Sequence, residues 1–275
     1  MTLAVTNPRT VPAELRRAGR SIGVLGPALI VVLMPAAIGI LVREEYALSG
    51  SLEFFGLMLR NFVPLLFPVL VTVVYLPRLS DEFANGFTGS VRTRTTLRTY
   101  LGSRIATAAL LSFLTFTAMI VVCWLVAFVI GPLVGMNEFE NVLPAGAAPD
   151  ALLDPVSRAT FTQLYADPPV LYGVVYAVWV GLNAALVAVF GTLSLILISN
   201  RFVALAVPTV AFLVVGFALQ VLGLAPFTPT FATFPFGLAQ QPLWTPFVPF
   251  MALAIVCAGL WVYVERRNFE TSGLD

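Results

Sequence analysis

The chain has 275 residues, of which 59% are hydrophobic and 11% are charged, with a formal net charge of +1. A soluble domain carries about 25% charged residues, so the composition excludes an ordinary soluble protein, and the near-neutral charge does not indicate a nucleic-acid partner. All fifteen basic residues are arginine. Without lysine the chain has no Walker A site for ATP, and without histidine it has no histidine-based catalysis or histidine metal site.

The first twenty residues are polar and basic. The spacing of Leu15, Ala18 and Ile22 places them on one side of a helix, which predicts a short helix lying in the membrane interface. A disordered basic tail is the alternative.

Six long apolar segments follow, and each is typical of a transmembrane helix rather than of a barrel strand. The third and fourth exceed the roughly 20 residues needed to cross a bilayer, so we expect them to tilt or project beyond it. Cys123 and Cys257 lie within apolar runs and are interpreted as small buried hydrophobic residues. The expected spans are 21–42, 57–77, 105–134, 170–199, 202–224 and 247–264.

The arginines divide unequally between the two sides of this arrangement. One side carries twelve, in the N-terminal segment, residues 78–104, Arg201 and the C-terminal tail. The other side carries three, which are Arg43, Arg60 and Arg158. The positive-inside rule then predicts a multi-pass protein of the cell membrane with both termini and residues 78–104 in the cytoplasm, and with the acidic loop 135–168 outside.

Residues 224–244 contain no charge, and six prolines occur between Pro226 and Pro249. Such a segment is too interrupted for a straight helix and too apolar for an ordinary loop. We expect a re-entrant element that is buried against the fifth and sixth spans; an interfacial loop with an aromatic belt is the alternative. The candidate external gate residues are Phe227, Phe231, Phe234 and Phe236.

The centres of the six spans carry no ionisable side chain. Ion-driven transporters and intramembrane hydrolases place such groups at mid-membrane, so this absence argues against both. Backbone carbonyls can also bind sodium, which leaves a secondary transporter as a minor alternative.

The segment 78–104 is the basic polar stretch between the second and third spans. Phe83, Phe87 and Val91 are spaced as one stripe of a helix, while Gly86 weakens a continuous helix and permits close approach of another backbone. The pattern predicts a short amphipathic cytoplasmic helix, then a break, then a helix that enters the membrane. A simple basic loop is the alternative.

Charged side chains flank this apolar stripe. Arg78 and Glu82 are spaced as an i,i+4 ion pair. Arg94 and Arg98 continue the helical spacing, and arginines near the surface are attracted to anionic lipid headgroups. Charge of both signs beside an apolar stripe is typical of an element that docks on a partner in one orientation.

Over nearly its full length the chain resembles the permease subunits of type-2 ABC transporters, mostly exporters. That family has an N-terminal interfacial helix, six spans and a re-entrant element before the last span. Its coupling segment between spans two and three has an acidic residue, a glycine and a basic run. Glu82 and Gly86 match the first two, and the long loop 135–168 departs from the family. The basic run is matched by Arg92, Arg94, Arg98 and Arg104.

The resemblance implies an all-α integral membrane permease domain that spans residues 1–275 and acts in export. The apolar surfaces of the spans indicate an amphipathic or lipophilic substrate, such as a drug, a peptide or a lipid-linked molecule. The resemblance also implies a second permease protomer, identical or related, and a separate ATPase subunit that holds ATP and magnesium. This chain is then not an enzyme by itself and carries no cofactor. A non-transporting scaffold or sensor is the alternative. The residues implied in coupling are Glu82, Phe83, Gly86, Phe87, Val91, Arg92, Arg94 and Arg98.

Overall fold

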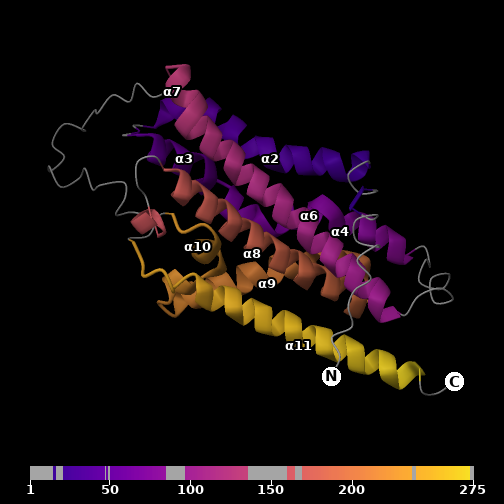
Figure 1. Ribbon diagram of the computed structural model, residues 1–275. Helices are drawn as coiled ribbons and strands as arrows, with labels where there is room; N and C mark the ends of the chain where they lie inside the picture. The colour runs from indigo at the N-terminus through magenta and orange to yellow at the C-terminus, as the bar shows by residue number, and fades with distance from the viewer. Residues whose placement is uncertain are drawn as a thin grey trace.

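A computed structural model gives the arrangement of most of the chain as a bundle of helices (Figure 1). In the part that it describes, the long elements are all helices and no strand is formed. The described residues are 15–16, 21–46, 48, 50–84, 97–135, 160–164, 169–236 and 240–272. The expected N-terminal interfacial helix lies outside them except for residues 15–16, as do most of the loop 135–168 and residues 85–96.

Six of the helices are long and apolar enough to cross a membrane, as predicted, and the protein is a multi-pass membrane protein of helical type. The third continues through a π-helical turn, Val126–Ile130, into α7, Gly131–Leu133. From Arg98 to Leu133 this helix has 36 residues and is about 54 Å long, which exceeds the roughly 30 Å hydrocarbon core. The six are α2 Ile22–Val42, α4 Val63–Ala84, α6 Leu97–Leu125, α8 Val170–Leu197, α9 Arg201–Val221 and α11 Phe247–Ser272.

The second span differs from its expected bounds at both ends. A separate helix, α3 Ser51–Arg60, precedes it, and α4 begins only at Val63. Pro64 explains the new start, because proline is tolerated in the first turn of a helix and disrupts its interior. At the other end α4 passes through Pro77 and continues to Ala84, so the beginning of the predicted coupling segment is the last part of a long helix.

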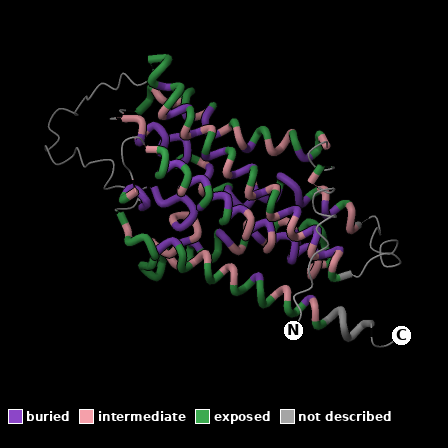
Figure 2. The backbone as a smooth tube through the Cα atoms, viewed as in Figure 1, coloured by how far each residue is buried: buried purple, intermediate pink, exposed green. Residues whose placement is uncertain are grey.

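Helix α8 is the central element of the bundle. In its most apolar stretch 61% of the residues are buried, against 22% in α9 and 11% in α11, and Figure 2 shows the buried backbone in the middle and the exposed α11 at the margin. Three glycines allow its neighbours to approach closely: a Cβ atom at Gly173 would lie 2.6 Å from the Trp124 ring, and Cβ atoms at Gly181 and Gly191 would overlap Thr117 and Leu76. Small residues at such contacts are typical of membrane helix packing.

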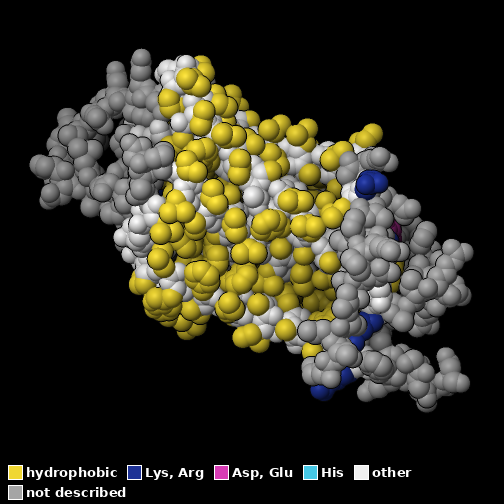
Figure 3. Space-filling view, viewed as in Figure 1, with side chains coloured by type: hydrophobic (Ala, Val, Ile, Leu, Met, Phe, Trp, Pro, Cys, Tyr) yellow, Lys and Arg dark blue, Asp and Glu magenta, His cyan; other side chains and the backbone are white. Residues whose placement is uncertain are grey.

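The two ends of the bundle differ in charge. Helix α2 begins and α11 ends at the same end (Figure 1). Arginine side chains gather there, next to a broad hydrophobic surface (Figure 3). We call this the arginine-rich end, and it carries Arg78, Arg98, Arg104 and Arg201. The opposite end carries the short helices.

Candidate functional site

At the arginine-rich end, Glu82 on α4 is paired with two arginines. Its carboxylate lies 2.9 Å from Nη2 of Arg104 on α6 and 3.7 Å from Nε of Arg78, one turn back on its own helix. The guanidinium of Arg104 also lies over the Tyr100 ring at 5.1 Å. Only 6% of Arg104 is exposed, so Glu82 neutralises a buried cation and joins α4 to α6.

Two further ion pairs join the outer helices to this end. Arg201 Nη1 at the start of α9 lies 3.4 Å from Asp81 Oδ1 on α4. Arg98 Nε at the start of α6 lies 2.8 Å from Glu265 Oε1 on α11. We call the seven residues of these pairs the ionic junction: Arg78, Asp81, Glu82, Arg98, Arg104, Arg201 and Glu265. Four helices, α4, α6, α9 and α11, are therefore joined through charges near the end of α4 and the start of α6.

The structure assigns intramolecular contacts to the described residues of the predicted coupling set. Glu82 and Arg98 belong to the ionic junction, and Phe83 is half-buried against the hydrophobic core. The pair of Arg78 and Glu82 is confirmed, and its signal was the i,i+4 spacing. The remaining predicted residues lie outside the described part of the chain: Gly86, Phe87, Val91, Arg92 and Arg94.

At the opposite end, residues 225–236 fold back into the bundle. They form the short helices η6 Ala225–Phe227 and α10 Pro229–Thr233. The indole nitrogen of Trp179 donates to the carbonyl oxygen of Ala232 at 2.8 Å, and Thr233 Oγ1 donates to Asn183 Oδ1 at 3.5 Å. Trp179 lies nine residues into α8, so α10 contacts α8 about 14 Å along its length.

Two of the four predicted gate residues are core residues. Phe234 is 1% exposed and packs edge-on against Phe67 of α4, with ring centroids 5.4 Å apart. Phe236 is 5% exposed and contacts Phe55 of α3 and Tyr176 of α8 at 5.9 and 5.2 Å. The segment thus packs against α3, α4 and α8 as well as the expected α9 and α11.

The other two predicted gate residues are half-buried. Phe227 lies beside Trp244, with ring centroids 6.0 Å apart. The backbone nitrogen of Phe231 lies 3.5 Å from Thr228 Oγ1, which caps the start of α10. These two side chains therefore lie nearer the surface of the bundle than Phe234 and Phe236.

A short segment of the predicted external loop holds this region in place. The backbone nitrogen of Thr160 donates to the carbonyl oxygen of Pro235 at 3.2 Å, and Thr160 Oγ1 accepts from the backbone nitrogen of Gln241 at 3.2 Å. Gln240 donates to Thr162 Oγ1 at 2.9 Å. Because these bonds join residues 75 to 81 positions apart, sequence reasoning did not find them.

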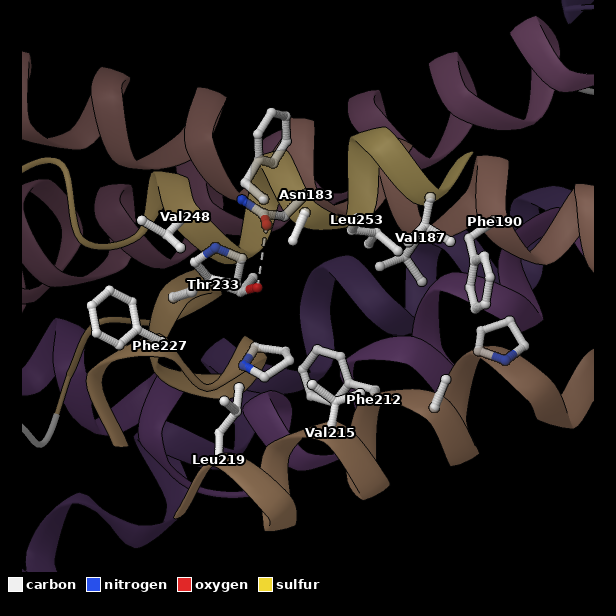
Figure 4. A pocket seen from close by; sticks show the side chains of 18 residues that line it. Asn183, Val187, Phe190, Phe212, Val215, Leu219, Phe227, Thr233, Val248 and Leu253 are labelled. Atoms are coloured by element: carbon white, nitrogen blue, oxygen red, sulfur yellow. Dashed lines mark hydrogen bonds between the residues drawn. The ribbon is translucent and has the colours of Figure 1, made fainter. Parts of the chain in front are cut away.

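An apolar cavity of about 400 Å³ lies between α8, α9, α10 and α11. Its eighteen lining residues include no charged one, and only Asn183 and Thr233 carry polar side chains. Figure 4 shows these two joined by a hydrogen bond at the cavity wall, with Phe212, Val215 and the other labelled apolar side chains around the space. Sequence reasoning missed this cavity, because it is created by the spacing of helices and not by a motif.

Within the described residues no group of acidic residues and cysteines has the arrangement of a metal site. Neither a protein-family model, nor a curated protein, nor a solved structure matches this chain. Inferences about function therefore rest on the ionic junction, the folded-back segment and the cavity.

Proposed function

We propose that this chain is the membrane-spanning subunit of an ATP-driven transporter of the type-2 ABC class, and that it exports an amphipathic or lipophilic compound. A separate ATPase subunit supplies the energy, and a second permease protomer completes the pathway. The observation that supports this proposal best is the ionic junction, because it surrounds the two helix ends from which residues 85–96 extend.

The junction provides a physical route for coupling. Residues 85–96 connect the end of α4 to the start of α6. The contact of Glu82 with Arg104 makes these two helix ends move together. The pairs of Asp81 with Arg201 and of Arg98 with Glu265 pass that displacement to α9 and α11.

In this proposal the arginine-rich end faces the cytoplasm, in agreement with the positive-inside rule. The ATPase docks on the apolar stripe that contains Phe87 and Val91, and Arg92 and Arg94 fix its orientation. The opposite end faces outside, and residues 225–236 are a re-entrant element that closes the pathway there.

The test of coupling is purification of the tagged chain from its native membrane with its associated proteins. We expect a P-loop ATPase to copurify, and we expect no ATP hydrolysis by this chain alone because it has no lysine. Phe87→Ala should weaken ATPase binding or make hydrolysis unresponsive to substrate. A control is Ile22→Ala, which also shortens an exposed apolar side chain at the same end of the bundle but is outside the ionic junction.

Replacement of Glu82 is a less specific test than replacement of Phe87, because it also removes the carboxylate that lies 2.9 Å from the buried Arg104. Normal transport and normal substrate-stimulated hydrolysis in Phe87→Ala would contradict the coupling role. Failure to recover any ATPase with the wild-type chain would contradict the transporter class.

Orientation has its own test. Ser157→Cys and Thr95→Cys are introduced one at a time after Cys123 and Cys257 are replaced by serine. A thiol reagent that does not cross membranes should label only Ser157→Cys in intact cells. Labelling of Thr95→Cys alone would reverse the proposed orientation.

A further inference from the structure

We propose that the cavity between α9 and α11 binds one uncharged, single-chain amphiphile. Its hydrocarbon chain fills the cavity, and its polar group forms hydrogen bonds with Asn183 and Thr233. This inference concerns the chain by itself, so it does not depend on an ATPase or on the proposed transport function.

The size of the cavity indicates an occupant. One water molecule's share of liquid volume is about 30 Å³, so the cavity is far larger than a single water needs. The cavity measures about 400 Å³, which falls in the roughly 300–1,000 Å³ range of small-molecule sites. Water cannot fill it well, because only two lining side chains are polar and each water needs two to four polar partners.

The position of the cavity indicates that the occupant comes from the bilayer. Helix α11 packs mainly against α8 and α10, and α9 packs against α4, α8 and α10, so the two outer helices leave a gap between them. Val215 on α9 and Val248 and Val256 on α11 line the cavity and are 45–48% exposed. The mouth therefore lies on the apolar outer surface of two membrane-spanning helices, where hydrocarbon chains are the surrounding medium.

The two buried polar side chains of the cavity wall determine which polar group a bound amphiphile can carry. Asn183 is 8% and Thr233 is 3% exposed. Asn183 Nδ2 donates to the Trp179 carbonyl oxygen at 2.9 Å, and an amide nitrogen carries a second hydrogen that can bond to a ligand oxygen. No charged side chain lines the cavity, and an unpaired charge in an apolar site is strongly disfavoured. The site thus selects a hydroxyl, ester or amide over an ionised headgroup.

The experiment uses the full chain in phosphatidylcholine nanodiscs with a monoacylglycerol that carries a diazirine in its acyl chain. After irradiation, labelled peptides are located by mass spectrometry. We expect saturable labelling of cavity residues on α8, α9 and α11. Unlabelled monoacylglycerol should compete, whereas a charged amphiphile of equal chain length, hexadecyltrimethylammonium, should compete at least about tenfold less well, equivalent to about 1.4 kcal/mol.

Two substitutions on α9 separate the cavity from the general lipid surface. Ala211→Trp adds a large side chain at the cavity wall and should reduce labelling about tenfold. Val214→Trp places the same side chain on the outer face of the helix, where Val214 is 60% exposed, and should leave labelling unchanged. Gel filtration and thermal unfolding confirm that each variant is folded.

The polar pair is tested with Asn183→Leu, which keeps the number and branching of the side-chain heavy atoms. The wild-type cavity should be labelled more strongly by the monoacylglycerol probe than by an alkyl-diazirine probe that has no polar group. In Asn183→Leu this ratio should fall about fivefold, which is the effect of losing one hydrogen bond. Should Ala211→Trp fail to fold, the competition series on the wild-type chain still decides the matter. Uniform labelling of all outer helix faces, or equal competition by the charged amphiphile, would overturn the proposal and indicate bulk lipid only.

Discussion

The two ends of the bundle are closed by different interactions. At the arginine-rich end the contacts are ion pairs, and the side chains of Arg201 and Asp81 are 50% and 68% exposed. At the opposite end the contacts are aromatic rings and hydrogen bonds from buried groups, with Phe234 at 1% exposure and the Trp179 indole bonded to the Ala232 carbonyl oxygen. Both ends bring distant helices together, but the two sets of contacts respond differently to solvent.

This difference bears on the energetic cost of separating the helices at each end. The exposed pair of Asp81 and Arg201 contributes about 0–1 kcal/mol and is weakened by salt, so it can separate and re-form at low energetic cost. Separation of Glu82 from the buried Arg104 costs more. Separation of the opposite end breaks close ring packing and leaves backbone groups such as the Ala232 carbonyl oxygen unpaired, and an unpaired backbone group is costly in hydrocarbon. In the proposed transporter, energy received at the arginine-rich end is needed to move the opposite end.

The largest expected effect comes from a charge placed at the opposite end. Phe234→Asp buries a carboxylate against Phe67 with no cation among its described ring contacts, and such burial costs several kcal/mol. We expect no folded protein by detergent gel filtration. Phe234→Leu should remain folded, and Phe231→Asp should have a smaller effect because Phe231 is only half-buried. A monodisperse Phe234→Asp protein at normal yield would show that this end is hydrated.

The second effect tests the buried part of the ionic junction. Glu82→Ala leaves Arg104 without its carboxylate partner, and we expect a loss of about 1–3 kcal/mol in the free energy of unfolding. The measurement is unfolding in mixed detergent micelles. The single variant Arg104→Ala and the double variant Glu82→Ala with Arg104→Ala are measured in the same way. If the two single losses add without coupling in the double variant, the contact does not stabilise the fold.

The six spans were predictable because their signal is local. A run of about 20 apolar residues is visible in the sequence without knowledge of its neighbours. Helix α3 was not predictable in this way, since Ser51–Arg60 is too short to span. The burial of Phe55 depends on Phe128 and Tyr172, which come from distant parts of the chain.

The candidate site shows the same limit. The pair of Arg78 and Glu82 follows from helical spacing, whereas the shorter contact of Glu82 with Arg104 depends on how α4 and α6 pack. The uncharged segment 224–244 predicted burial, but which rings Phe234 and Phe236 meet is a property of the bundle. The cavity at Asn183 depends on the gap between α9 and α11.

The third effect removes one hydrogen bond from the opposite end. Trp179→Phe keeps an aromatic ring near Phe247 and Phe250 but leaves the carbonyl oxygen of Ala232 without its indole donor. We expect a loss of about 1 kcal/mol in the free energy of unfolding. Because the bond is buried, the loss should be the same at low and high salt. A salt-dependent loss would show that water and ions reach this bond.

The smallest effect comes from the exposed pair at the arginine-rich end. Asp81→Asn removes the negative charge that faces Arg201 at 3.4 Å and should cost about 0–1 kcal/mol. Unlike the effect of Trp179→Phe, this cost should disappear at about 1 M salt, where the screening length falls to about 3 Å. Charge reversal of both residues, Asp81→Arg with Arg201→Asp, should restore the wild-type salt response if the pair acts through charge alone. If Asp81→Asn costs as much in high salt as in low salt, the contact behaves like the buried contacts of the opposite end, and the two ends do not differ as described.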